Sequence, residues 1–120
     1  MANIQEQIPG IESVSDPRFP HAPPGWTRES ALEVAQQERL TLGDDHWEVL
    51  RGLQEFFARH ENGVVNMRDL HDALDEKFHY KGGMKYLYML LPGGPIAQGC
   101  RLAGLKSPAG AIDRSFGSVA

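Results

Sequence analysis

Apolar side chains recur at three- and four-residue spacing through the middle of the chain, a pattern typical of helices that bury one face. In the clearest run, residues 41–63, the sequence Thr41-Leu42-Gly43-Asp44 is interpreted as a capping box, and Gly63 as part of the stop signal. The apolar positions of this run are Trp47, Val49, Leu50, Leu53, Phe56 and Phe57. We interpret these side chains as core residues and not as a cofactor site.

The same spacing predicts four further helices. One covers about residues 28–39 after a cap at Thr27, and another follows a cap at Asn66. A fourth starts at Met84, and a fifth runs from Pro95 to Gly104, because proline favours the first helical position and glycine the position after the last. The turn at residues 79–83 joins two short helices, as in a helix-turn-helix. No stretch alternates strictly enough to predict a strand, so the expected fold is mainly all-α, a compact bundle of about five helices.

The two ends of the chain have little capacity to pack. Residues 1–25 contain five prolines and few large apolar side chains, so they are predicted to be poorly ordered, with room for a small β-hairpin around residues 8–14. Residues 106–120 are rich in Gly, Ser, Ala and Pro and are predicted to form a flexible C-terminal arm. The helical domain is therefore expected to occupy residues 26–105.

Composition places the chain among soluble globular proteins of one domain, with 120 residues of which 41% are hydrophobic and 23% charged. No apolar run approaches the roughly 18 residues of a membrane span, and no signal peptide is recognised, so the cytoplasm is the expected location. The net charge of −4 is unevenly divided. Residues 1–76 carry six Lys or Arg against fifteen Asp or Glu, whereas residues 77–120 carry six against one. The single cysteine lies in this basic part.

Cys100 is the one side chain that offers distinctive covalent chemistry, and it falls near the middle of the fifth predicted helix. As the only cysteine it cannot form an internal disulfide. Nearby cations stabilise a thiolate, and Lys85, Arg101 and Lys106 are the candidates for that role. The alternative is that Cys100 is a small buried core residue, and the helical pattern alone favours this alternative.

Other chemistries lack their motifs. The five histidines come with no paired cysteines and no HExxH sequence, so no metal site is predicted. No nucleophile elbow supports serine hydrolysis, and the glycine pairs at 82–83 and 93–94 lack the Lys and Ser or Thr of a phosphate loop. No cofactor is predicted.

Several segments, in order, resemble the DsrC/TusE family of sulfur-relay proteins. They are TL-x3-HWEV at 41–49, YLY at 86–88, LP-x-GP at 91–95, Q-x-C-x2-AGL at 98–105 and Pro108. The resemblance covers about residues 25–112. It implies a small helical domain with a flexible arm that acts as a carrier and not as an enzyme. In DsrC-like members the arm enters dissimilatory sulfite reductase and carries sulfur between two cysteines, and TusE-like members pass persulfide sulfur toward tRNA thiolation.

The chain departs from the family at the principal sulfur-carrying cysteine. A family motif similar to AGLPKPxGC ends in that cysteine, and here residues 103–111 read AGLKSPAGA, which places Ala111 there. The second family cysteine matches Cys100. The resemblance therefore implies altered sulfur chemistry, in which Cys100 accepts a persulfide sulfur or forms a mixed disulfide with a partner.

An alternative function stays open at this point. The chain could be a regulatory or docking module for sulfurtransferases or sulfite reductase that keeps the family shape without its full chemistry. Binding of nucleic acid by the helix-turn-helix pair is less favoured, because Asp69, Asp72, Asp75 and Glu76 on the third helix would repel phosphates.

Overall fold

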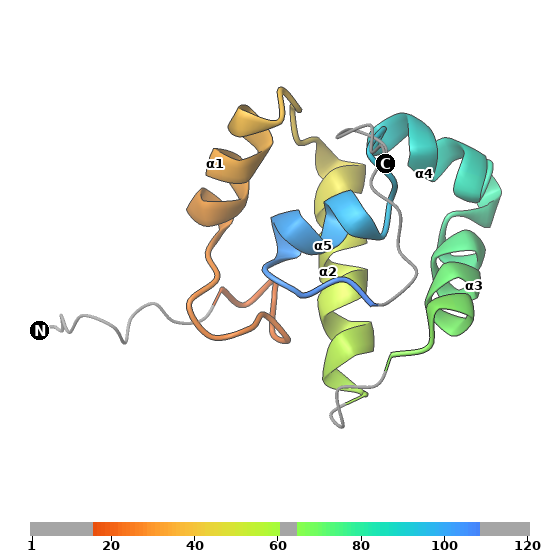
Figure 1. Ribbon diagram of the computed structural model, residues 1–120, viewed down its shortest axis with the longest axis horizontal. Helices are drawn as coiled ribbons and strands as arrows, with labels where there is room; N and C mark the ends of the chain where they lie inside the picture. The colour runs from red at the N-terminus through yellow and green to blue at the C-terminus, as the bar shows by residue number, and fades with distance from the viewer. Residues whose placement is uncertain (1–15, 61–64, 109–120) are drawn as a thin grey trace, which may run out of the picture.

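Five α-helices and one 3-10 turn make up the part of the chain that the computed structural model describes, residues 16–60 and 65–108 (Figure 1). The elements are α1 (Arg28–Gln37), α2 (Asp44–Ala58), α3 (Met67–Lys77), η1 (His79–Lys81), α4 (Met84–Leu90) and α5 (Ala97–Ala103). The described residues contain no strand, which confirms the mainly all-α prediction. The hairpin expected at residues 8–14 and the arm beyond residue 108 lie outside the described residues.

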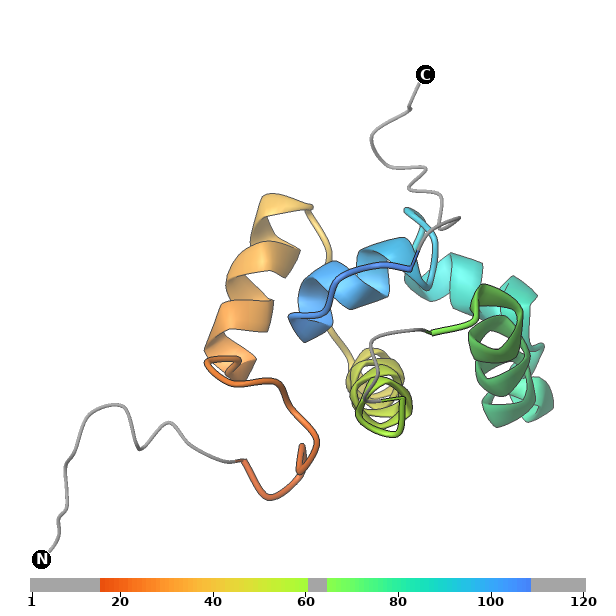
Figure 2. The same cartoon turned by 60° about the horizontal axis from the view of Figure 1, so that its bottom comes forward.

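Helix α2 is the centre of the packing. Helix α5 crosses it, α1 covers α5 from one side, and α3 with α4 lies on the other side of α2 (Figures 1 and 2). The core joins buried side chains from all five helices, including Ala31, Leu50, Leu70, Leu87 and Leu102. None of the helices in residues 16–60 and 65–108 is long and apolar enough to span a membrane.

The start of α2 differs from the predicted capping box. The residue before the helix is Gly43, and Thr41 makes no cap. The backbone N–H of Gly43 donates to Nδ1 of His46 at 3.0 Å, so the histidine ring takes the place that a Glu or Gln side chain has in a capping box. With Nδ1 as acceptor, Nε2 carries the proton and donates to the carbonyl of Leu90 at 2.8 Å. His46 thus ties the start of α2 to the end of α4.

Two other helix starts follow their predicted caps. The Thr27 hydroxyl accepts from the backbone N–H of Ser30, and the Ser30 hydroxyl accepts from that of Thr27, both at 3.0 Å. The Asn66 side chain accepts from the first backbone amides of α3. Helix α2 ends at Ala58, before the predicted stop at Gly63, and α5 begins at Ala97 and not at Pro95, because Gly94 at φ 108° and the residues after it form turns.

The turn between α3 and α4 has the predicted helix-turn-helix character and depends on two glycines. Gly82 and Gly83 both have positive φ, at 119° and 65°. A Cβ atom on Gly83 would stand 2.3 Å from Oδ1 of Asp75. That oxygen accepts from the backbone N–H of Met84 at 2.8 Å, so Asp75 on α3 caps α4.

Candidate functional site

Cys100 lies in the middle of α5 with a relative exposure of 0%. Its helix neighbour Gly99 faces α2 so closely that a Cβ atom there would stand 2.7 Å from Cδ1 of Leu53. Helix α5 contains no exposed residue, and six of its seven residues are buried. The thiol is therefore closed off from solvent in this conformation.

Burial governs the acid-base behaviour of this thiol. It raises the pKa of Cys100 to about 12, from an ordinary value of 9.0. A hydrogen bond from the Ser107 side chain and the positive charge of Arg101 lower the pKa, but by less than burial raises it. At neutral pH the buried thiol is therefore protonated and unreactive.

The segment after α5 turns back toward the helix that carries the thiol. Gly104 takes the left-handed conformation at φ 77°, and the backbone N–H of Leu105 donates to the carbonyl of Cys100 at 2.8 Å. The chain then runs back alongside α5, as both views show (Figures 1 and 2). We call residues 105–108 the strap. Ser107 of the strap is one of the two groups that lower the pKa of Cys100.

Arg101, one of the three predicted cations, is engaged by an acid that the sequence analysis did not single out. Its guanidinium donates to both carboxylate oxygens of Glu38, at 2.7 and 2.8 Å. Gln98 donates to the same carboxylate at 2.8 Å and accepts from the backbone N–H of Gly93 at 2.8 Å. The hydrogen bond from Arg101 is the main cause that lowers the pKa of Glu38. This network joins the end of α1 to α5 and to the loop before α5.

The other two predicted cations are not among the groups that shift the pKa of Cys100. Lys85 is exposed on α4, and Lys106 is exposed on the strap. The positive charge that lowers the pKa of Cys100 is that of Arg101. Ala111, which the family resemblance predicts to stand at the carrier position, lies outside the described residues.

Two buried side chains fix the C-terminal end of α5, and the sequence analysis singled out neither. The indole N–H of Trp26 donates to the carbonyl of Leu102 at 2.8 Å, and the side-chain amide of Gln54 donates to that of Ala103 at 3.0 Å. The only signal in the sequence is the position of Gln54 beside Leu53 on the apolar side of α2. A polar residue on a buried helix face needs a partner, although the sequence does not name it.

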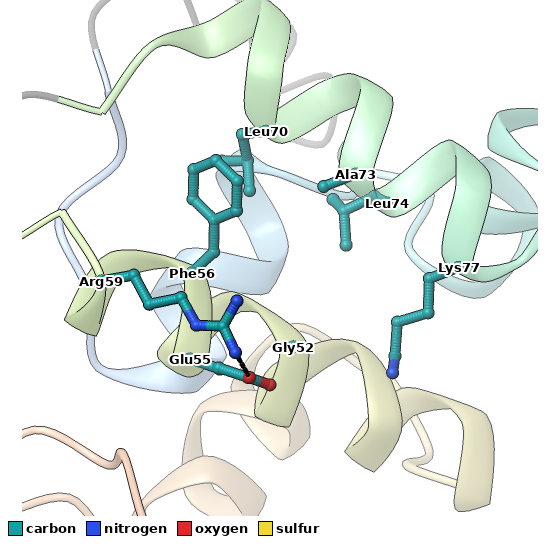
Figure 3. A pocket seen from close by; sticks show the side chains of 8 residues that line it. All are labelled: Gly52, Glu55, Phe56, Arg59, Leu70, Ala73, Leu74 and Lys77. Carbon is teal, nitrogen blue, oxygen red and sulfur yellow. Dashed lines mark hydrogen bonds and ion pairs between the residues drawn. The ribbon is translucent and has the colours of Figure 1, made fainter.

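A separate hollow of about 170 Å³ lies between α2 and α3 (Figure 3). Its lining consists of Gly52, Glu55, Phe56, Arg59, Leu70, Ala73, Leu74 and Lys77. Figure 3 shows the Phe56 ring beside Leu70 and the ion pair between Arg59 and Glu55. Neither Cys100 nor the strap lines this hollow, so it is not part of the thiol's surroundings. Within residues 16–60 and 65–108, no group of three or more His, Cys, Asp or Glu side chains could hold a metal ion.

Comparison with known proteins gives consistent results. The family model described as "DsrC like protein" matches residues 13–112. Among curated relatives, sulfurtransferase TusE of Photorhabdus laumondii is 40% identical over 84 residues, which is 69% of this chain and 75% of the relative. Sulfurtransferase TusE of Escherichia coli K12 is 36% identical over 84 residues, 69% of this chain and 76% of the relative.

Two solved structures share the fold. The NMR structure of Allochromatium vinosum DsrC has a TM-score of 0.60 and 36% identity, and the match covers 72% of this chain and 78% of that one. The crystal structure of the oxidized gamma-subunit of the dissimilatory sulfite reductase (DsrC) from Archaeoglobus fulgidus has a TM-score of 0.58 and 30% identity. That match covers 73% of this chain and 81% of the other.

Proposed function

Because this chain belongs to the DsrC-like protein family, we propose that it is a sulfur-relay carrier whose sulfur-accepting group is Cys100. The observation that carries the proposal is the lone cysteine of a chain whose relatives are named sulfurtransferases. A carrier holds sulfur in a covalent bond and needs a partner for each transfer. It is not an enzyme in its own right, and at most it is an accessory to one.

The transfer requires a thiolate and a sulfane sulfur. The Cys100 thiolate attacks the terminal sulfur of a donor persulfide, and a new S–S bond forms on Cys100. The donor's own S–S bond breaks, its electron pair leaves with the donor thiolate, and the proton of the donor persulfide stays on the transferred sulfur. Atoms and electrons balance without an external oxidant. With a disulfide in place of the persulfide, the same attack gives a mixed disulfide and releases the other thiolate.

One cysteine limits what this relay can do. With alanine at position 111, no second thiol of the chain can take the sulfur from Cys100 or close a disulfide with it. Every transfer is therefore intermolecular, and the next acceptor belongs to a partner. We propose sulfurtransferases of the relay or dissimilatory sulfite reductase as partners, on the strength of the relatives' names. The cytoplasm is the proposed location, since a lone free thiol suits a reducing compartment.

Persulfide loading tests the proposal. The reduced full chain is incubated with a small-molecule persulfide donor, and its intact mass is measured. A gain of one sulfur atom is expected in the natural chain and none in Cys100→Ser. No gain, under conditions that load a two-cysteine relative, would remove Cys100 as the acceptor.

A second candidate function is a docking or regulatory module for the same class of partners. The observation that favours it is the burial of Cys100 with its pKa raised to about 12, which suits a packing role. Binding to sulfurtransferase subunits that is unchanged in Cys100→Ser would support docking. Nucleic acid is the less favoured ligand, since Asp69, Asp72 and Glu76 are exposed on α3. Salt-sensitive retention on a specific promoter fragment would reverse that ranking.

A further inference from the structure

We propose that the hollow between α2 and α3 is a self-association site, and that it takes the exposed face of α4 from a second copy of this chain. In this contact Met89 of one copy enters the hollow of the other, and Lys85 faces acidic side chains of α3. The inference goes beyond the proposed function, because neither surface includes Cys100 and the contact involves no sulfur.

The hollow is a groove between one stripe of residues on α2 and one on α3. On each helix the lining residues follow the spacing i, i+3, i+4 and i+7, from Gly52 to Arg59 on α2 and from Leu70 to Lys77 on α3. Figure 3 shows the apolar side chains of the lining between Arg59 at one end and Lys77 at the other. Apolar cavities of about 150 Å³ hold a benzene-sized group. A hollow of about 170 Å³ therefore has room for one large apolar side chain.

The fold does not require a glycine at position 52. Glycine inside a helix is less stable than alanine at the same place. A Cβ atom on Gly52 would stand 3.5 Å from Cδ and Cε of Lys77, which is an ordinary van der Waals distance, and the φ angle of Gly52 is not positive. The missing side chain instead leaves the backbone of α2 open to the hollow, as the close approach of another molecule requires.

The charges around the hollow favour a cationic neighbour on its α3 side. Arg59 and Lys77 are each paired with a glutamate of α2, at N–O distances of 2.5 and 3.7 Å. Asp69 and Glu76 lie four residues before and three residues after Ala73, so they flank the α3 edge of the groove. Both are exposed, and neither forms an ion pair within residues 16–60 and 65–108. A lysine beside this edge would therefore be attracted to it.

The exposed face of α4 has the complementary chemistry. Met89 is 73% exposed, and Lys85, four residues earlier and so on the same side of the helix, is exposed as well. Methionine is unbranched and flexible, which suits it to filling an irregular hollow. Leu32 on α1 is also exposed, at 48%, but Glu29 and Glu33 stand beside it, and the acids of α3 would repel them. The face of α4 is therefore the better match to the hollow.

Sedimentation velocity of the full chain measures the association. Each copy carries both surfaces, so two copies can make the same contact twice in a symmetric pair. Each contact is small, so the expected dissociation constant is about 0.1 to 1 mM, and the sedimentation coefficient should rise as the protein concentration approaches about 1 mM. A reductant is present throughout, so that a disulfide between two Cys100 residues does not imitate the contact.

Three variants address the two surfaces separately. Gly52→Leu fills the hollow, whereas Met89→Gln and Lys85→Glu change the face of α4. Each is expected to weaken the association by at least about 5-fold. Leucine is a better helix former than glycine, so the urea midpoint of Gly52→Leu should be no lower than that of the natural chain. The matched control is Leu32→Gln, which removes an exposed leucine that lies on neither surface and should leave the association unchanged.

A mixture of two variants gives the sharpest result. Gly52→Leu keeps the face of α4 and Met89→Gln keeps the hollow, so one molecule of each can make the contact once. The mixture should therefore associate more strongly than either variant alone at the same total concentration. A natural chain that stays monomeric up to about 1 mM would reject a second copy as the occupant of the hollow. A mixture no stronger than its components, or an equal loss in Leu32→Gln, would overturn the proposed contact.

Discussion

Replacing Cys100 with alanine should remove a specific loss of stability at high pH. Burial raises the pKa of Cys100 from 9.0 to about 12, so the folded chain keeps its thiol protonated while the unfolded chain ionises. The thiol's contribution to stability is fully present below pH 9 and is lost as pH rises toward 12. Stability therefore falls with rising pH in this window, because the unfolded state releases a proton that the folded state retains.

The magnitude follows from the two pKa values. Above pH 9 the free energy of unfolding should fall by about 1.4 kcal/mol per pH unit from this thiol alone. Between about pH 8 and pH 10.5 the expected loss is roughly 2 kcal/mol. Tyr86 and Lys81, whose pKa values are raised by their hydrogen bonds to Asp45, also titrate at high pH. Both remain in Cys100→Ala, so their contributions cancel in the difference between the two proteins.

The assay is urea unfolding of both proteins at a series of pH values. At pH 7 the alanine variant should be less stable by about 1 kcal/mol, the cost of a small cavity. The difference in the free energy of unfolding between the two proteins should shrink to zero and then change sign as pH approaches 10.5, because only the natural chain carries the buried thiol. Two parallel curves across this range would show that Cys100 is not desolvated in the folded chain.

Three further predictions address the surroundings of the thiol. Trp26→Phe leaves the Leu102 carbonyl without its donor and should lower the free energy of unfolding by about 1 to 3 kcal/mol in urea titrations; a loss near zero would contradict the buried hydrogen bond. Glu38→Gln should lower the free energy of unfolding by about 1 to 2 kcal/mol at pH 7. Because the pKa of Glu38 is lowered mainly by Arg101, this loss should shrink as pH falls below 4.5. A loss of stability that does not depend on pH would refute the role of the ion pair. Ala111→Cys should let mild oxidation remove two hydrogens by an internal disulfide with Cys100, seen in the intact mass; dimers alone would contradict the assignment of position 111.

Local pattern was enough to predict the helices. The apolar spacing that predicts a helix within residues 41–63 is confirmed by α2, whose Val49, Leu50 and Leu53 are fully buried. The caps at Thr27 and Asn66 are also confirmed, because a cap depends on residues two or three positions apart. The predicted cap of α2 was wrong, because the N-cap is Gly43 and its backbone N–H donates to the ring of His46, where the usual capping box has a Glu or Gln side chain as acceptor.

Pairs that lie far apart in the sequence were not predictable. Glu38 and Arg101 are 63 residues apart, and Trp26 and Leu102 are 76 apart. Their pairing depends on how α1, the loop before it and α5 cross in space. No periodicity within one helix contains that information, so Arg101 was predicted as a cation near the thiol without its acidic partner.

The sequence by itself determined that the chain is helical, that its one thiol lies within a short helix, and that residue 111 is alanine. These follow from the spacing of apolar residues, from the capping, proline and glycine residues at helix ends, and from residue identity, which are local properties. Only the tertiary structure decided the state of the thiol. Burial is the largest influence on the pKa of Cys100, and it depends on the elements that pack around the thiol in space, which the local sequence does not specify.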